Sequence, residues 1–463
     1  MRVSIEKSDI AGELQAPSSK SMTIRALMCA ALARGETVIE RPLVSDDTNA
    51  AAEVLEKIGV RISKEEGVWH VRGGALRVPT GDLYCGESAT TLRFLAAVCA
   101  LIPGEHRLTG GPSLSRRPVR SLMKALRMLG VKSELEGKTT PPITISGGNL
   151  RGGHTELPGH ISSQFISALL LVAPYAEKEV SIKLTTPMTS RPYVLMTLRC
   201  MREFGVKVAR SFDSFVVKRQ RYKPALFRVE GDWSSASYFL ALGAISEAGV
   251  RVENIRTTSL QGDRVVLDFL RNMGAKVRVE GDSVTVSRGD LKAIKADLSD
   301  CIDLLPTLAV LAALSAGVSE FIGIERARIK ESNRVAAIKE GLENLGVNLS
   351  ENVDRMVIQG LLAGDVSQEA EEDIADESEE GEIESESAGV SPEESGEPAD
   401  FSDGPRVVTI NSHNDHRIAM AFSVFGAAEG GIIIEGAECV SKTYPSFWDT
   451  LKSIGGQLKI DSE

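Results

Sequence analysis

Lysine and arginine side chains recur in this chain at the starts of expected helices, next to small hydroxylated residues. The clearest case is the segment 17–25, where a polar turn leads into apolar spacing typical of a helix. Free backbone N–H groups and the positive end of the helix dipole, together with Lys20, Ser21 and Arg25, would bind a phosphate or carboxylate. A capped surface helix is the alternative for any one such segment, so the prediction depends on how often the pattern recurs.

Four more segments repeat this combination. In residues 160–165 the hydroxyls of Ser162 and Ser163 and the amide of Gln164 open an apolar helix and could hold phosphate oxygens. Because the segments are spread over the chain, we expect them to converge on shared anion sites. The other three are residues 86–93, which include Ala89, residues 115–118, which include Arg117, and residues 190–193, which begin with Ser190.

The C-terminal half adds carboxylates to these cations. Asp303 precedes an apolar helix, and Glu331 lies between Lys330 and Arg334, which a helix would place on one face. A carboxylate held among cations stays ionised, whereas one that loses water has a raised pKa, and such contrasts separate a base from an acid. For residues 415–417 a structural ion-pair cluster is the alternative. The remaining candidate cations are Arg417 and Lys442.

An internal repeat indicates the fold that must position these side chains. Six expected helices end at a glycine and are followed by strands, and glycine suits the left-handed turn that ends a helix. Successive glycines are 71, 75, 69, 72 and 109 residues apart; they are Gly59, Gly130, Gly205, Gly274, Gly346 and Gly455. Six α/β units fit two similar globular domains better than a solenoid, whose repeats are usually about 20 to 50 residues long.

We therefore expect an α/β chain of two domains. A boundary near residue 226 halves the repeat series, and the first strand precedes the first complete unit, so it would pair with the C-terminal domain. The expected division is residues 17–226 for one domain, and residues 1–16 together with 227–463 for the other. The chain would then cross between the domains twice.

The net charge of −11 comes from one acidic segment. Residues 363–405 hold seventeen Asp and Glu and no Lys or Arg, so the rest of the chain carries +6. This composition cannot bury enough apolar surface to offset its chain entropy, so we expect a disordered insertion. We expect it at the tip of a hairpin between strands at residues 356–358 and 407–410, where a long loop costs little.

The composition otherwise indicates a reduced, cytoplasmic globular protein. No apolar run approaches the roughly 18 residues of a membrane span, and the N-terminus has no apolar signal core. The six cysteines show no CxxC pairing and mostly have apolar neighbours, which argues against disulfides and metal ligands.

Taken together, these motifs closely resemble the EPSP synthase family, the 3-phosphoshikimate 1-carboxyvinyltransferases, over nearly the whole chain apart from the acidic segment. The resemblance implies two domains, each of three βαβαββ units about a pseudo-threefold axis (an inside-out α/β barrel), with the active site in the interdomain cleft. It implies transfer of the enolpyruvyl group of phosphoenolpyruvate to the 5-hydroxyl of shikimate 3-phosphate, a shikimate-pathway step, without metal or organic cofactor. The matching segments are residues 18–21, 162–165, 190–193, 231–236, 328–334, 415–417 and 442–443, with Arg25.

The resemblance also implies roles for individual residues. Asp303 would be the base for the attacking hydroxyl and Glu331 the acid that protonates the methylene carbon of phosphoenolpyruvate, with Lys20 also catalytic. The positions that match phosphoenolpyruvate binding are Lys20, Arg117, Arg334, Arg417 and Lys442. Those that match shikimate 3-phosphate binding are Ser21, Arg25, Ser162, Ser163, Gln164, Ser190, Asp303 and Lys330, with Gln164 reaching both substrates.

Three residues depart from the family pattern. Ala89 stands where many members have glycine, Asn333 where aspartate is common, and Arg326 where others have asparagine. An added methyl group in a close-packed site typically costs about 1 to 3 kcal/mol for the ligand it crowds. Our hypothesis is that Ala89 weakens binding of the family inhibitor glyphosate more than that of phosphoenolpyruvate.

Two other functions fit the residue pattern less well. The related enolpyruvyl transfer to UDP-N-acetylglucosamine uses a reactive cysteine before the Arg-Pro turn, and residues 110–118 contain none. A nucleic-acid-binding scaffold would need basic stripes interleaved with aromatics, and only 5% of the residues are aromatic. We expect a monomer that binds two small anionic substrates and neither nucleic acid nor membrane.

Overall fold

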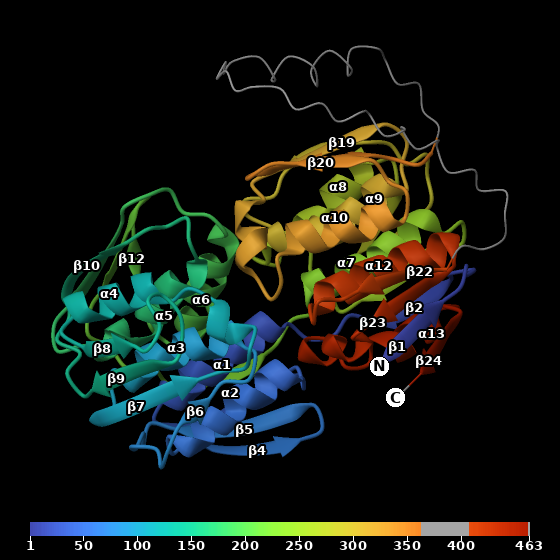
Figure 1. Cartoon of the computed structure of the whole chain (residues 1–463). Helices are drawn as coiled ribbons and strands as arrows, with labels where there is room; N and C mark the ends of the chain where they lie inside the picture. The colour runs from blue at the N-terminus through green and yellow to red at the C-terminus, as the bar shows by residue number, and fades with distance from the viewer. Residues whose placement is uncertain (363–406, 462–463) are drawn as a thin grey trace, which may run out of the picture.

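The computed structural model describes residues 1–362 and 407–461, which form two lobes of similar build (Figure 1). The predicted acidic insertion, residues 363–405, lies outside the described residues. Each lobe has its own hydrophobic core, one from residues 22–229 and the other from residues 3–16 with 233–358 and 410–454. The predicted α/β class with two similar halves is confirmed.

The N lobe runs from α1 to β14. Its elements are α1 (Lys20–Leu32), β3 (Gly35–Glu40), α2 (Asp46–Lys57), β4 (Arg61–Glu65), β5 (Val68–Gly73), β6 (Leu83–Tyr84), α3 (Ala89–Cys99), β7 (Gly104–Thr109), η1 (Leu114–Arg116), α4 (Arg120–Met128), β8 (Lys132–Leu135), β9 (Ile143–Gly147), β10 (Gly153–Leu157), α5 (Ser163–Val172), η2 (Ala173–Tyr175), β11 (Val180–Leu184), α6 (Arg191–Glu203), β12 (Ala209–Arg210), β13 (Ser214–Val217) and β14 (Leu226–Arg228).

The C lobe combines the first two strands with everything described after β14. Its elements are β1 (Arg2–Ile5), β2 (Gly12–Gln15), α7 (Trp233–Ile245), β15 (Val250–Glu253), η3 (Gly262–Val265), α8 (Val266–Asn272), β16 (Lys276–Glu280), β17 (Ser283–Ser287), β18 (Lys295–Asp297), η4 (Ile302–Leu304), α9 (Leu305–Ala313), β19 (Val318–Ile322), η5 (Glu325–Ile329), α10 (Arg334–Asn344), β20 (Leu349–Glu351), β21 (Arg355–Gln359), β22 (Val408–Asn411), α12 (His416–Glu429), β23 (Ile432–Glu435), η6 (Ala437–Lys442), α13 (Phe447–Ser453) and β24 (Leu458–Asp461).

Six four-stranded sheets share one pairing pattern. In each sheet one edge pair is parallel and the other two pairings are antiparallel, as in β6–β7–β9–β8. The N lobe also contains β14–β3–β5–β4 and β10–β11–β13–β12; the C lobe contains β16–β17–β15–β2, β18–β19–β21–β20 and β22–β23–β1–β24. In four sheets a crossover helix joins the two parallel strands, as expected for a βαβαββ unit. In the other two, the parallel pairs are β14 with β3 and β2 with β15, so the edge strand comes from a distant part of the chain. The implied six-unit architecture is confirmed.

The outer helices end where the repeat predicted. α2, α4, α6, α8, α10 and α13 are each followed by one residue and then by the glycine of the repeat. These six glycines have φ between +78° and +99°, a conformation that glycine adopts without a Cβ penalty. The glycine series was therefore a reliable sequence marker of the units.

The inner helices are buried on nearly all sides and begin at the junction of the lobes. All nine residues of α9 are buried, and in α1, α3 and α5 every residue is buried except Lys20, Ser21, Thr90 and Gln164. These four exceptions lie in the first turn of their helices. Because helix N-termini carry free N–H groups and positive partial charge, the N-lobe helices point an anion-binding surface at the C lobe.

The chain crosses between the lobes twice. β1 pairs with β23 and β24, so the expected pairing of the first strand with the C-terminal part is observed. β14 pairs with β3, which puts the return crossing at residues 229–232, just after the expected boundary. The two crossing segments are hydrogen-bonded to each other, from Ser19 N to Glu230 O at 2.8 Å and from Asp232 N to Pro17 O at 2.8 Å.

Two local expectations were wrong. β21 and β22 do not form a hairpin, because β21 belongs to one sheet and β22 begins the next unit, so the acidic segment connects two units. Lys330 and Arg334 do not share a helix face, because α10 begins only at Arg334 and Lys330 lies in the turn before it.

Among the helices of the described residues, none is both long and apolar enough to cross a bilayer.

Candidate active site

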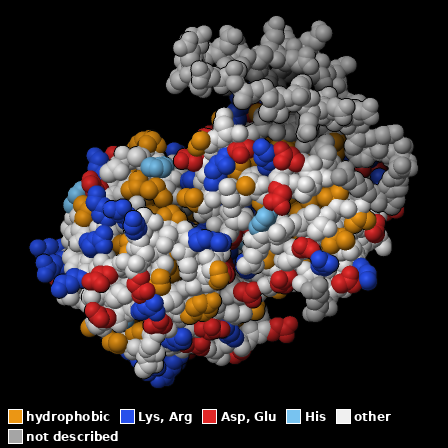
Figure 2. All heavy atoms as spheres, viewed as in Figure 1, with side chains coloured by type: hydrophobic (Ala, Val, Ile, Leu, Met, Phe, Trp, Pro, Cys, Tyr) orange, Lys and Arg blue, Asp and Glu red, His pale blue; other side chains and the backbone are white. Residues whose placement is uncertain are grey.

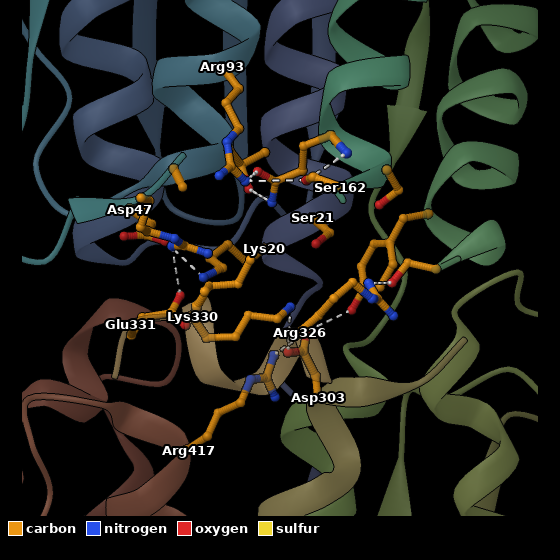
Figure 3. A pocket seen from close by; sticks show the side chains of 18 of the residues that line it. Lys20, Ser21, Asp47, Arg93, Ser162, Asp303, Arg326, Lys330, Glu331 and Arg417 are labelled. Carbon is orange, nitrogen blue, oxygen red and sulfur yellow. Dashed lines mark hydrogen bonds and ion pairs between the residues drawn. The ribbon is translucent and has the colours of Figure 1, made fainter. Parts of the chain in front are cut away.

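One pocket between the lobes gathers nearly all the predicted site residues (Figure 3). From the N lobe it is lined by Lys20, Ser21, Arg25, Ala89, Arg117, Ser162, Ser163, Gln164 and Ser190, and from the C lobe by Asp303, Lys330, Glu331, Arg334 and Arg417. Lys20, Ser21 and Ala89 are first-turn residues of α1 and α3, so the inner helices place them at the junction.

Asp303 is surrounded by positive charge. Its Oδ1 accepts from Arg334 Nη1 at 2.7 Å and from Lys330 Nζ at 3.2 Å, while its Oδ2 accepts from Tyr193 Oη at 3.0 Å and lies 3.3 Å from Arg417 Nη2. Burial alone would raise the pKa of Asp303, but Arg417, Lys330 and Arg334 together hold it well below the usual value. Asp303 is therefore a carboxylate at neutral pH, as a base must be.

Glu331 is the second carboxylate of the pocket. It accepts from Arg334 Nη2 at 2.6 Å and from Arg117 Nη1, across the lobes, at 3.3 Å. Burial raises its pKa, but Arg117 and Arg334 outweigh burial and hold the pKa well below the usual value. An anion that bound these two arginines would weaken their hold on Glu331 and favour its protonated, acid form.

Arg334 links three carboxylates, of which Asp303 and Glu331 line the pocket. Its guanidinium is 1% exposed and donates to Asp303, to Glu331 and, from Nε at 2.8 Å, to the fully buried Asp415. Burial lowers the pKa of Arg334, but Asp415, Glu331 and Asp303 together raise it by more than burial lowers it. Arg334 is therefore permanently charged. The guanidinium thus fixes the base and the acid relative to each other.

Two N-lobe arginines are held without an ion-pair partner among the described residues. Arg25 donates to Thr197 Oγ1 at 2.8 Å and to two backbone carbonyls, and burial lowers its pKa to about 10. Arg93 donates to Gln164 Oε1 at 2.7 Å, and its buried Nε has no partner within the part of the chain that is described. Burial and Arg117 lower the pKa of Arg93, and an anion in the pocket would relieve both effects.

Lys330 is a partly buried lysine of the pocket whose pKa is lowered. Burial lowers the pKa of its ammonium group to about 8, although Asp303 opposes that shift. Lys330 is thus still mostly charged at neutral pH, and a bound phosphate would strengthen its charged form.

Direct bonds between the lobes close the pocket. Arg326 Nη1 donates to Ser190 Oγ at 2.7 Å, and Ser113 Oγ donates to the Glu331 carbonyl at 2.8 Å. Tyr193 on α6 reaches Asp303 across the same junction. In this structure the lobes are therefore closed on each other.

Lys442 is placed differently from the other predicted residues. It is not among the residues that line the pocket, and its Nζ donates to the Asn414 carbonyl at 2.5 Å. Sequence reasoning left several lining residues out of the candidate site, namely Asp47, Thr90, Arg93, Pro118, Ile161, Tyr193, Arg326, Ile329 and His416. Arg93 could have been predicted from the sequence, because it lies one helical turn after Ala89 on α3. No sequence pattern indicated Asp47, which pairs with Lys20 at 2.8 Å.

Comparison with known proteins identifies the family. The model of "EPSP synthase (3-phosphoshikimate 1-carboxyvinyltransferase)" matches residues 5–373 and 381–451. The chain belongs to the EPSP synthase family. Curated relatives include a 3-phosphoshikimate 1-carboxyvinyltransferase of Dehalococcoides mccartyi, 43% identical over 100% of both chains, and one of Methanothermobacter thermautotrophicus, 38% identical over 99% of this chain and 100% of the relative.

Solved structures agree with this family assignment. An EPSP synthase from Acinetobacter baumannii has a TM-score of 0.74 and 28% identity over 100% of both chains. The enolpyruvyl transferase NikO from Streptomyces tendae has a TM-score of 0.72 at 14% identity, covering 99% of this chain and 98% of that one, and shows a shared fold. Membership of the EPSP synthase family therefore rests on both sequence and architecture.

Proposed function

We propose that this chain transfers the enolpyruvyl group of phosphoenolpyruvate to the 5-hydroxyl of shikimate 3-phosphate and releases phosphate. The observation that carries the proposal is the single pocket in which Asp303 and Glu331 are bridged by Arg334 and faced by cations from both lobes. Two unit charges 4 Å apart repel by about 4 kcal/mol at an effective dielectric constant near 20, so two anionic substrates need such cations in order to meet.

The roles proposed for the residues follow from the family and from the geometry. Asp303 would take the proton of the 5-hydroxyl, and Glu331 would protonate the methylene carbon. Phosphoenolpyruvate would bind Lys20, Arg117, Arg334, Arg417 and Lys442; shikimate 3-phosphate would bind Ser21, Arg25, Ser162, Ser163, Gln164, Ser190 and Lys330. Lys442 would need to release the Asn414 carbonyl to take part.

Phosphate release with three sets of substrates tests the proposal. Purified protein with phosphoenolpyruvate and shikimate 3-phosphate should release phosphate, and phosphoenolpyruvate alone should not. Release with UDP-N-acetylglucosamine in place of shikimate 3-phosphate would support the related transferase instead. Figure 2 gives no support to nucleic-acid binding, because on that face positive and negative side chains are interspersed over both lobes.

We also propose the division of the chain and its state in the cell. Residues 17–226, and 1–16 with 227–463, would be the two domains, which open to admit substrates and close for catalysis. The chain would act as a monomer. The six cysteines are free and buried, which fits the reducing cytoplasm.

Glu331→Gln should lower kcat by roughly 10² to 10⁴ and leave KM for both substrates within about tenfold. The amide keeps the shape of the side chain and an oxygen for one of the two arginines, Arg117 and Arg334, but its NH₂ group is not acidic and cannot protonate the methylene carbon. Steady-state kinetics of phosphate release measure the effect. Glu340→Gln on α10, whose carboxylate contacts His413 outside the pocket, is the matched control and should keep wild-type turnover. A near-normal kcat in Glu331→Gln would contradict the proposal that Glu331 is the acid.

Ala89→Gly should tighten glyphosate inhibition more than it lowers the KM for phosphoenolpyruvate. Ala89 is the first residue of α3, is 3% exposed and lines the pocket, so its methyl group limits the space for a ligand. We expect the inhibition constant to fall by roughly fivefold to a hundredfold, corresponding to about 1 to 3 kcal/mol. Ala96→Gly, deeper in the same helix, controls for helix destabilisation. Equal changes in inhibition constant and KM would contradict the hypothesis.

A further inference from the structure

A second, smaller chamber adjoins the active-site pocket. It shares Lys20, Ser21, Tyr193 and Arg417 with that pocket, and its other lining residues are Asp232, Ser234, Ser235, Gln261, Asp263 and Thr443. The proposed reaction gives no task to this chamber. Its most unusual member is Asp263, on the 3₁₀ helix η3.

Asp263 is a buried carboxyl group with an unused oxygen. The side chain is 1% exposed; Oδ2 accepts from Ser234 Oγ, and Oδ1 has no partner within the described chain. A buried carboxylate without a cation of its own is costly, so such a group tends to keep its proton. Burial and the negative charge of Asp303 raise the pKa of Asp263 to about 7.

Arg417 pairs with Asp303 and lines the same chamber as Asp263. Its Nη2 lies 3.3 Å from Asp303 Oδ2, and both Asp303 and Asp263 favour its charged form. The other titratable groups facing Asp263 are Asp232 on α7, Tyr193 on α6, Lys20 on α1, and Asp303 and Cys301 at η4. Lys20 and Arg417 are the cations that line the chamber, and both have a proposed contact with phosphoenolpyruvate. Lys20 already pairs with Asp47 at 2.8 Å, whereas the charge of Arg417 favours the ionised form of Asp263.

We propose that Asp263 is a positioning residue that, once ionised, competes with phosphoenolpyruvate for Arg417 and so sets an upper pH limit for tight phosphoenolpyruvate binding. The protonated group is neutral and leaves Arg417 to the substrate. The ionised group adds a second negative charge beside Asp303 and draws Arg417 toward the chamber. This inference rests on the proposed function, because it needs Arg417 to bind phosphoenolpyruvate.

Asp263→Asn tests the inference, because the amide copies the protonated acid and can still accept from Ser234. The KM for phosphoenolpyruvate is measured from pH 6 to pH 9 in both proteins, and the ratio of wild type to variant cancels the ionisation of the substrate. We expect a ratio near one at pH 6 and roughly threefold to tenfold at pH 9. kcat should change much less than KM.

Two further variants keep the test decisive. Asp232→Asn changes a chamber carboxylate that already caps α7 through Ser235 N at 2.9 Å, and it should keep the rise of KM with pH. Ser234→Ala removes the hydroxyl that stabilises ionised Asp263, so the rise should move to higher pH. Ser234→Ala also serves if Asp263→Asn does not fold.

The outcomes separate the two proposals. A KM ratio that stays constant with pH, or a rise that Ser234→Ala leaves in place, would overturn the role of Asp263. Absence of phosphate release by the wild type with both substrates would overturn the proposed function instead.

Discussion

Asp303→Asn is expected to lower kcat by roughly 10² to 10⁴ while changing the KM for shikimate 3-phosphate less than about tenfold. The carboxylate accepts from Arg334, Lys330 and Tyr193 and faces Arg417, so its ionised form is heavily favoured and is available as a base. An amide cannot take the proton of the substrate hydroxyl, and its NH₂ group would face a cation.

Single-turnover and steady-state measurements of phosphate release, with binding of shikimate 3-phosphate by calorimetry, separate chemistry from binding. Asp300→Asn is the matched control, because Asp300 is exposed, lies three residues before Asp303 and, among the described residues, accepts only from Arg191 N, at 2.9 Å outside the pocket. It should keep kcat within about twofold. If Asp303→Asn keeps substantial turnover, the base is another group.

Arg334→Gln is expected to cost about 3 to 5 kcal/mol of unfolding free energy at pH 7.5, in addition to losing phosphoenolpyruvate binding. The substitution leaves Asp303, Glu331 and the fully buried Asp415 in one place without the cation that joins them. Arg334→Lys should recover only part of the loss, since one ammonium group cannot reproduce three directed contacts.

The loss of unfolding free energy in Arg334→Gln should depend on pH in a predictable direction. In the native protein the pKa values of Asp303 and Glu331 are lowered, so their contribution to stability is present above about pH 4 and is lost as pH falls. Without Arg334 that contribution is reduced, so the deficit relative to wild type should be nearly constant from pH 7.5 to pH 5 and should shrink as pH falls below about 4. Urea unfolding followed by circular dichroism measures it.

Arg328→Gln is the control for Arg334→Gln. Arg328 is three-quarters buried, pairs with Glu351 near the surface and lies outside the pocket. Its loss should cost about 1 kcal/mol or less. A deficit for Arg334→Gln no larger than this, or one that grows toward acid pH, would show that the three carboxylates do not depend on Arg334.

Features set by local chain chemistry could be predicted from sequence. The six glycines mark helix ends because a left-handed residue is needed there whatever the rest of the chain does. The candidate cations at helix starts were predictable for a similar reason, since a polar turn before an apolar run fixes where a helix begins. Both signals lie within a few residues.

Features set by tertiary packing could not be predicted in this way. Nothing near Tyr193 or Arg326 in the sequence indicates that they reach Asp303 and Ser190 across the lobes. The expected hairpin between β21 and β22 was wrong for the same reason. The spacing of the two strands along the chain is compatible with pairing, and only the arrangement of units puts them in different sheets. Lys442 looked like the other cations, yet its Nζ contacts a backbone carbonyl.

The position of β1 has a consequence for synthesis on the ribosome. The N-terminal strand fits between β23 and β24, which are the last two strands made, whereas every strand of the N-lobe sheets exists once residue 228 has been translated (Figure 1). The N lobe can therefore complete its sheets while much of the polypeptide is still missing, but the first residues to emerge wait longest for their partners. Deleting residues 1–5 should therefore destabilise the C lobe, which is completed last, and should leave the stability of the N lobe unchanged.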